Sequence, residues 1–309
     1  MDVNVLQFRQ SLVRARSKQS CHRSCHLGTH ELVTKVATRF TGQPVSRGYD
    51  CFMNTYSLAI DVGNTRIKCG LMSSTNGTLP DCVDVIASPI QTGLDWKSVL
   101  EAVRRQGRQI DRSIVSGSNP RLLSTLLASW PESLEKPRRI DSARELPIEM
   151  DVDEPAAVGL DRVLNAIAVN AVRKSTQPAI VIDSGTATTI DLISRDGVFS
   201  GGTILPGIEL SAKALHHYTD LLPLIEMSEL DHTNLKPPGR NTRDAIQNGI
   251  LYGHIGAIRE IVRELKSGSS ESAITLLTGG AGDMLSHHLS EAKCIPFLAL
   301  RGLALSSAT

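Results

Sequence analysis

The chain has 309 residues, of which 41% are hydrophobic and 21% are charged, and its formal net charge is +1 at pH 7. This length is enough to bury a sizeable core, and the near-neutral charge excludes the strong field of a protein that binds nucleic acid or an anionic membrane. No apolar run reaches the roughly 18 residues of a membrane span. The six scattered cysteines are typical of free thiols, so we expect a cytoplasmic protein.

Residues 1–52 differ in composition from the rest of the chain. They hold eight Lys and Arg residues against three acids, a net charge of +5. We expect a disordered leader, and the alternatives are a transit peptide or a mis-assigned start with Met53 as the true first residue. The run "CHRSCHLGTH" at 21–30 would place His22, His26 and His30 on one helical face, but its spacing matches no standard zinc pattern.

From residue 56 onward, apolar alternation predicts strands and helical spacing predicts helices between them. In chain order we expect strands at 57–63, 66–72 and 83–88, a helix at 96–106, a strand at 112–117 and a helix at 121–130. The polar, proline-containing stretch 131–147 is expected to be a linker or a loop with a short strand.

The second half of the chain again alternates strands and helices. We expect a helix at 159–174 that ends in Lys and Arg, paired strands within 179–193, strands and turns at 197–207, helices at 208–222 and 243–265, and a strand at 273–278. Gly201, Gly202, Pro206 and Gly207 are expected to shape a loop. The glycine turn at 278–280 precedes another helix and is a candidate nucleotide contact.

One pattern occurs twice. "IDVGNT" at 60–65 and "IDSGTAT" at 182–188 each place an aspartate, a glycine and a threonine directly after an apolar strand. Such an internal repeat predicts two similar α/β domains, at 53–150 and 151–309, that bind a ligand between them.

The loop at 61–68 has two interpretations. Gly63 and Asn64 suit a plain β-hairpin turn. The same turn would also form a phosphate-binding loop, in which backbone N–H groups, the Thr65 hydroxyl and the Lys68 cation face an anion. A carboxylate such as Asp61 is useful beside phosphates only if it holds a metal ion or orients a nucleophile.

Taken in order, "DVGNTRIK", "GLDR", "DSGTATTID", "GGTILPG", "NTRDAIQNG" and "TGGAG" resemble the motifs of type III pantothenate kinase, over residues 57 to about 305. The resemblance implies two ribonuclease H-like domains, the duplication shared by actin, Hsp70 and the acetate and sugar kinases (ASKHA), with the active site in the cleft between them. It also implies a homodimer that uses ATP, Mg²⁺ and a monovalent cation, K⁺ or NH₄⁺, to phosphorylate pantothenate in coenzyme A biosynthesis. The alternatives are a kinase of another small hydroxy acid or sugar, or a non-catalytic transcription-accessory relative.

The resemblance also implies roles for the matching residues. Asp161 would be the general base for the pantothenate hydroxyl, and Asp183 would hold the monovalent cation. The planar fork of Arg162 suits a carboxylate or another oxyanion. The implied ATP-binding residues are Asp61, Val62, Gly63, Asn64, Thr65, Arg66, Ile67, Lys68 and Thr186. The implied substrate-binding residues are Gly159, Leu160, Asp161, Arg162 and Thr242, the last of which is also a candidate helix N-cap.

The sequence departs from the family at one position. Seven residues before Gly159 the family commonly has a tyrosine that touches pantothenate, and here that position is Val152. Because valine has no hydroxyl, the resemblance predicts a weaker hold on pantothenate at this point.

Overall fold

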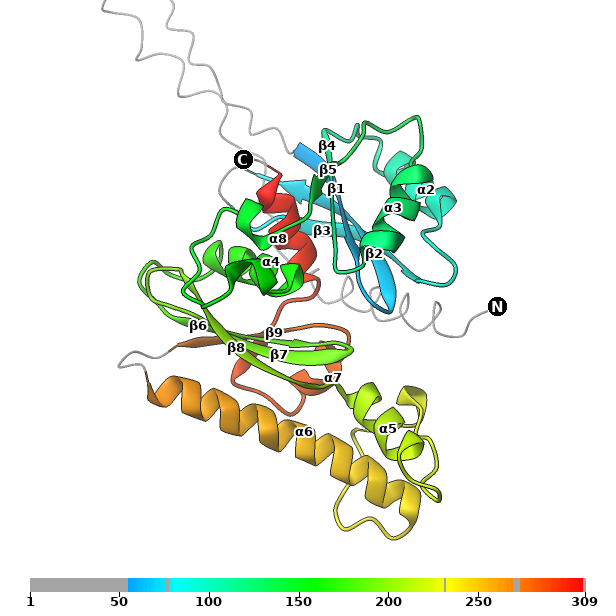
Figure 1. The fold of residues 1–309 in the computed structure, drawn as a ribbon, viewed down its shortest axis with the longest axis vertical. Coiled ribbons are helices and arrows are strands. Elements are labelled where there is room, and N and C mark those ends of the chain that lie inside the picture. The colour runs from blue at the N-terminus through cyan, green and yellow to red at the C-terminus, as the bar shows by residue number, and fades with distance from the viewer. Residues whose placement is uncertain (1–54, 76–77, 231, 269–272, 308–309) are drawn as a thin grey trace, which may run out of the picture. The chain divides into compact units, whose positions relative to one another are not determined.

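The computed structural model describes residues 55–75, 78–230, 232–268 and 273–307, so the leader and the Cys/His run lie outside the described residues (Figure 1). The first sheet consists of β1 (Thr55–Val62), β2 (Arg66–Ser74), β3 (Asp81–Pro89), β4 (Arg112–Gly117) and β5 (Arg138–Ile140). Their order is β3-β2-β1-β4-β5. The β1–β2 and β2–β3 pairs are antiparallel, whereas β4 runs parallel to both β1 and β5.

The second sheet repeats this plan. It consists of β6 (Ala179–Ser184), β7 (Ala187–Ile193), β8 (Phe199–Pro206), β9 (Ile274–Thr278) and β10 (Ala292–Cys294), in the order β10-β9-β6-β7-β8. The β6–β7 and β7–β8 pairs are antiparallel, whereas β9 runs parallel to both β6 and β10, as in the first sheet. The predicted duplicated α/β fold is therefore confirmed. The predicted loop at Gly201 and Gly202 is wrong, because both glycines lie within β8.

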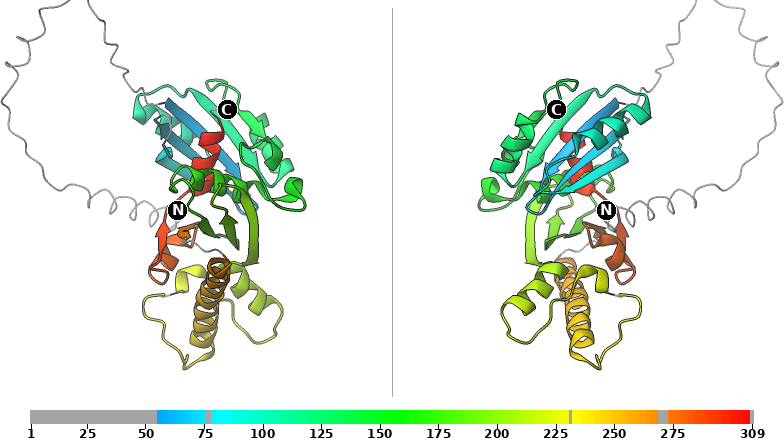
Figure 2. Two further views of the ribbon diagram at one scale, coloured as in Figure 1. Left: turned by 90° about the vertical axis from the view of Figure 1, so that its left-hand side faces the viewer. Right: turned by 90° about the vertical axis from the view of Figure 1, so that its right-hand side faces the viewer.

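Helices cover both sheets (Figure 1). They are α2 (Trp96–Gln106), α3 (Pro120–Ala128), α4 (Leu160–Asn170), α5 (Ile208–His217), α6 (Thr242–Ser267), α7 (Gly282–Ser286) and α8 (Leu298–Ser306), with single 3₁₀ turns at Ala143–Glu145, Pro155–Ala157 and Met227–Glu229. The side views in Figure 2 show α5 and α6 together at one end. Helix α4 stops at Asn170, so the Lys and Arg expected in its last turn lie beyond it. No helix in the described part of the chain is long and apolar enough to cross a membrane.

Two strands direct their side chains in the same way. Successive residues of a strand face opposite sides of its sheet. In β1, Ile60 packs with α2 and α3, while Ala59 packs with α4 and α8. In β6, Ile182 packs with α6, while Val181 packs with α4 and α8. A residue two positions after Ala59 or Val181 therefore faces the α4 side of its sheet.

Helices α4 and α8 pack in very close contact. A Cβ atom on Gly302 of α8 would lie 1.9 Å from the carbonyl oxygen of Leu164 on α4, so only glycine permits this approach. Leu300 and Leu303 of α8 share a buried cluster with Ala59 of β1. The last helix of the chain thus completes the core of the first sheet.

Candidate active site

Three aspartates from three elements converge on one side of α4. Asp61 and Asp183 are the penultimate residues of β1 and β6, and the strand alternation turns both toward α4. Asp161 is the second residue of α4, whose N-cap is Gly159. One turn later on the same helical face, Asn165 Nδ2 donates a hydrogen bond of 2.7 Å to Asp183 Oδ2. The helix start therefore lies beside both strand ends.

The converging charges perturb one another. Burial is the largest cause that raises the pKa of Asp61 to about 6; Lys68 opposes the rise, and Asp161 and Asp183 add to it. Burial also raises the pKa of Asp183, against the opposing effects of Lys68 and of the Asn165 hydrogen bond. Carboxylates that resist ionisation in this way are stabilised by a bound cation.

The loops after the two strands meet. The β1–β2 connection is the expected hairpin, closed by a hydrogen bond of 3.0 Å from Gly63 N to Arg66 O. Its exposed Thr65 lies opposite Thr186 of the β6–β7 hairpin, with the two hydroxyl oxygens in hydrogen bond at 3.1 Å. Lys68 pairs with Asp61 across the first hairpin. Two hydroxyls and one cation thus gather at the aspartates, and their role in binding phosphate stays a prediction.

The "GLDR" motif forms the start of α4. Asp161 is exposed, and its Oδ1 accepts a hydrogen bond of 2.9 Å from the backbone N–H of Arg162. The Arg162 guanidinium instead reaches Asp191 on β7, with Nη2 2.5 Å from Oδ1. Sequence reasoning singled out neither Asp191 nor Asn165. Two signals for Asp191 were present in the sequence: its place at the end of the motif "DSGTATTID", and a charge inside the otherwise apolar run "TIDLI".

A buried polar chain supports the second hairpin. Ser184 Oγ lies 2.9 Å from Thr188 Oγ1, which lies 3.1 Å from His254 Nε2 on α6. Burial lowers the pKa of His254, so the neutral imidazole is favoured. The predicted third loop also contacts this hairpin, because Ala281 N donates a hydrogen bond of 3.0 Å to Ser184 O. The second hairpin is therefore fixed from two sides.

The structure does not bring Thr242 to the aspartates. Thr242 is the first residue of α6, and α6 packs on the face of the second sheet opposite α4. Asn241 is the N-cap of α6, since its side chain accepts a hydrogen bond from Asp244 N; the alternative that Thr242 caps the helix is wrong. Val152, in contrast, is packed in the cluster that contains Phe199.

The side chains of this site supply only some of the ligands that a bound cation needs. Among the described residues, no three carboxylate, imidazole or thiol groups stand close enough to form a metal site. Mg²⁺ commonly binds through one or two carboxylates together with substrate phosphates, and Asp61 suits that arrangement. Beside Asp183, the Oδ1 atom of Asn165 is buried and has no hydrogen-bond partner within the described part of the chain. An unpartnered oxygen beside a carboxylate is a donor set that suits a hard cation.

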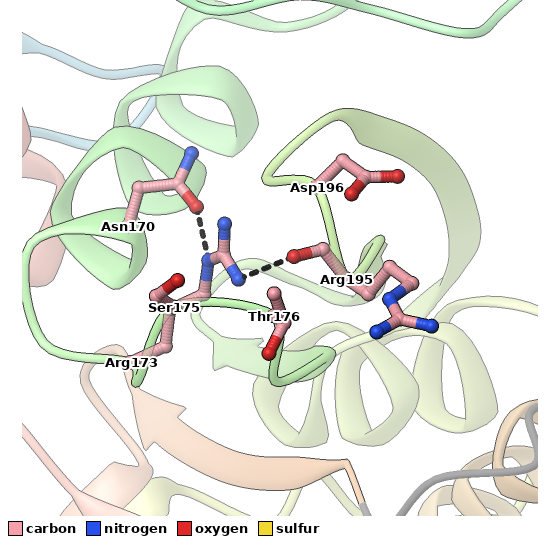
Figure 3. A pocket seen from close by; sticks show the side chains of 6 residues that line it. All are labelled: Asn170, Arg173, Ser175, Thr176, Arg195 and Asp196. Atoms are coloured by element: carbon pink, nitrogen blue, oxygen red, sulfur yellow. Dashed lines mark hydrogen bonds between the residues drawn. The ribbon is translucent and has the colours of Figure 1, made fainter.

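A cavity of about 470 Å³ lies elsewhere, lined by Asn170, Arg173, Ser175, Thr176, Arg195 and Asp196. Figure 3 shows Arg173 hydrogen-bonded within this cavity to the Asn170 side chain and the Arg195 carbonyl, at 2.6 and 2.8 Å. Because its donors are used by the protein itself, Arg173 connects the end of α4 to the β7–β8 turn rather than presenting a charge to a ligand.

The family model and the relatives in sequence agree on one family. A family model described as type III pantothenate kinase matches residues 57–264. The chain is 32% identical over 258 residues to the type III pantothenate kinase of Rubrobacter xylanophilus, covering 80% of this chain and 95% of that protein. It is 31% identical over 254 residues to the type III pantothenate kinase of Halalkalibacterium halodurans, covering 80% of this chain and 97% of that protein. A solved structure from Campylobacter jejuni, titled a conserved putative Baf family transcriptional activator, matches with a TM-score of 0.52 at 20% identity over 81% of this chain and 97% of that one, which shows a shared fold.

Proposed function

The chain belongs to the type III pantothenate kinase family, and from this membership we propose that its converging aspartates carry out the family reaction. The enzyme is a kinase that uses ATP with a divalent metal ion to phosphorylate a hydroxyl of pantothenate, the first step of coenzyme A biosynthesis. The observation that carries the residue assignments is the meeting of Asp61, Asp161 and Asp183 at two strand ends and one helix start.

Asp161 is the general base in this proposal. Its carboxylate takes the proton of the pantothenate hydroxyl, the hydroxyl oxygen forms a bond to the γ-phosphorus of ATP, and the bond to the bridging oxygen breaks to leave ADP. The exposure of Asp161 supports the assignment, because a substrate can reach it. Gly159, Leu160 and Arg162 form the substrate-binding surface around it.

The two hairpins bind ATP in this proposal. The meeting of Thr65 and Thr186 supports it, since their hydroxyls and the neighbouring backbone N–H groups offer donors to phosphate oxygens. Lys68 adds positive charge beside them. Asp61 would hold Mg²⁺, which neutralises phosphate charge when bound.

Asp183 would hold the monovalent cation, K⁺ or NH₄⁺. Two observations support this assignment: the raised pKa of Asp183, caused mainly by burial, and the unpartnered Oδ1 of Asn165 within the described residues. A cation between these oxygens and the ATP phosphates would relieve the repulsion between two sets of negative charge.

A homodimer is the final part of the proposal. Large apolar side chains are exposed on β8, α5, the segment after α5, and α6: Ile204, Leu210, Leu215, Tyr218, Leu221 and Tyr252. A second copy would cover such a surface. Since α6 lies on the opposite face of the second sheet from Asp161, a pantothenate contact by Thr242 would come from the other copy.

The first test is ADP release with pantothenate and a panel of other small alcohols. We expect ATP turnover with pantothenate well above every other alcohol. Turnover with a different hydroxy acid or sugar alone would contradict the substrate, and absence of ADP release with every alcohol would contradict the enzyme.

The dimer is tested by light scattering and by mixing two variants. Asp161→Asn lacks the base and Thr242→Arg blocks the other contact, so each alone should be inactive. Mixed dimers would hold one intact site, and the mixture should regain activity. A fully active monomer, or a mixture without regained activity, would contradict the shared site.

A further inference from the structure

Asp191 is a buried carboxylate that the family reaction, as assigned above, does not use. It lies on β7 with its side chain 1% exposed, and its partner Arg162 is 15% exposed. Arg162 Nε lies 3.0 Å from Oδ1 and 3.3 Å from Oδ2, and Nη2 lies 2.5 Å from Oδ1. One edge of the guanidinium is thus fully engaged by this single carboxylate.

The other side of the guanidinium is available. Its Cζ atom lies 5.4 Å from the centroid of the Phe199 ring, so an aromatic surface supports it. Within the described part of the chain, Arg162 Nη1 has no hydrogen-bond partner. Arg162 directly follows Asp161, whose negative charge is close enough to act on Asp191. The Nη1 side of the Arg162 guanidinium is therefore held in a fixed orientation next to Asp161, the proposed base.

The fold keeps room for this carboxylate. Asp191 pairs across the sheet with Gly202 of β8, and a Cβ atom on Gly202 would lie 2.2 Å from the Ile190 carbonyl oxygen and 2.3 Å from Asp191 Oδ1. Any larger residue would displace the β7 backbone as well as the Asp191 carboxylate. Burying an ion pair contributes little net stability, because the desolvation of both charges offsets their attraction. The arrangement is better explained by the orientation of Arg162 than by stability.

We propose that Asp191 is a positioning residue, which holds the Arg162 guanidinium so that its Nη1 edge meets the carboxylate of pantothenate while Asp161 meets the hydroxyl. This inference rests on the proposed function. In this arrangement two adjacent residues of α4 recognise the two ends of the substrate: Arg162 binds the carboxylate and Asp161 binds the hydroxyl. Asp191 itself touches neither pantothenate nor ATP and acts only through Arg162.

The test compares Asp191→Asn with the parent enzyme on two substrates. Asparagine keeps the shape and one acceptor oxygen but loses the charge. We expect the KM for pantothenate to rise roughly tenfold to hundredfold, as for a lost charge-assisted interaction, with kcat and the KM for ATP within about twofold. For pantothenol, in which an alcohol replaces the carboxylate, the variant and the parent should have the same KM. Asp84→Asn is the control, because it removes the charge of another aspartate paired with an arginine, Arg105, at 2.8 Å. It should leave the KM for pantothenate and for pantothenol unchanged.

A second comparison remains decisive even if Asp191→Asn alone fails to fold. In an Arg162→Gln background, adding Asp191→Asn should leave the KM for pantothenate unchanged and raise the melting temperature, because an unpaired buried charge is removed. An equal loss on pantothenate and pantothenol, an unchanged KM for pantothenate in Asp191→Asn, or a further rise in the Arg162→Gln background would overturn the proposal. A parent enzyme without activity on pantothenate would instead contradict the proposed function.

Discussion

The β1–β2 and β6–β7 hairpins occupy the same place in their sheets, yet the chain surrounds their aspartates differently. Opposite Asp61 stands Lys68, whereas the residue opposite Asp183 is the uncharged Thr189. Asp183 instead accepts a hydrogen bond from Asn165. Lys68 thus acts on both aspartates, but only Asp61 has it on its own hairpin, and only Asp183 has an amide hydrogen bond from α4 in addition.

The support beneath the two hairpins also differs. The second hairpin rests on the buried Ser184–Thr188–His254 chain, while Ser116, at the end of the neighbouring strand β4 in the first sheet, is buried with no hydrogen-bond partner among the described residues. Duplicated topology therefore fixes where each carboxylate points but not what it holds. We propose a monovalent ion at Asp183 because of the family resemblance and the Asn165 Oδ1 atom that has no hydrogen-bond partner within the described residues, and a divalent ion at Asp61 because one carboxylate with phosphates suits Mg²⁺.

The largest expected effect is on the proposed base, Asp161, which lies next to the aspartates of both hairpins. Asp161→Asn should lower kcat by on the order of 10²–10⁴-fold, because the amide cannot accept the proton. ATP binding measured by calorimetry should be unchanged, since both hairpins are intact. Asp153→Asn, an exposed neighbour, is the matched control. If Asp161→Asn kept more than half of the parent rate, the base would have to be another residue.

The assignment of different cations is tested at Asp183. The parent enzyme should be more active in K⁺ or NH₄⁺ than in Na⁺ buffer, and Asp183→Ala should lose that difference. Asp61→Ala should show weaker Mg²⁺ dependence instead. The measurement is initial rate against each ion in turn. A full K⁺ response in Asp183→Ala would show that the two aspartates do not divide the ions in this way.

The raised pKa of Asp61 predicts a stability effect of definite sign. A carboxylate whose pKa rises to about 6 on folding favours the folded state when protonated, and this contribution is lost as pH rises from about 4 through 6. Asp61→Asn should therefore raise the free energy of unfolding at pH 7.5 by roughly 1–2 kcal/mol after allowance for the half-buried setting, with no gain at pH 3.5. Thermal unfolding without ligands measures this, and a lower melting temperature at pH 7.5 would contradict it.

A smaller effect is expected at Val152, which belongs to the second half of the site. Val152→Tyr should lower the KM for pantothenate about threefold to tenfold, the value of one neutral hydrogen bond, with the KM for ATP unchanged. Val152 packs in the Phe199 cluster, so a tyrosine must fit beside the ring that supports Arg162. Val152→Phe, which adds the ring without the hydroxyl, separates packing from hydrogen bonding. An unchanged or higher KM in the tyrosine variant would mean that this position does not replace the family tyrosine.

The smallest effect is expected from the leader. Deleting residues 1–52 should leave kinetics and melting temperature unchanged, because both hairpins and their supports lie after residue 54. Stoichiometric zinc in the full chain alone, or a large drop in melting temperature on truncation, would give the leader a structural role.

The sequence predicted what local patterns encode. The strand–aspartate–glycine–threonine repeat made the duplication visible, and Gly159 before an apolar stripe located α4. Asn165 and Asp191 were not predicted, because the role of each depends on a partner on another element. Asn165 contacts Asp183, and Asp191 contacts Arg162. Nothing in the linear pattern states which strand residue a helix start will face.

The sequence also failed to predict β10 and α8. The short run "AKC" offers too few residues for alternation, and "LALRGLALS" contains a glycine that lowers the expectation of a helix. That glycine is the residue that allows the close contact with Leu164, so the packing of the whole chain overrides a local preference.

The close contact of α8 also has a consequence for synthesis on the ribosome. Leu300 and Leu303 share a buried cluster with Ala59 of the first strand, so residues far apart in the sequence must meet. A nascent chain cannot close that core until α8 has left the exit tunnel, and contacts this distant in sequence form slowly. The first sheet therefore stays incompletely covered during synthesis of the second sheet, because α8 follows it in the sequence. A chain released before α8 is made would contain both hairpins, but the core of its first sheet would be open to water.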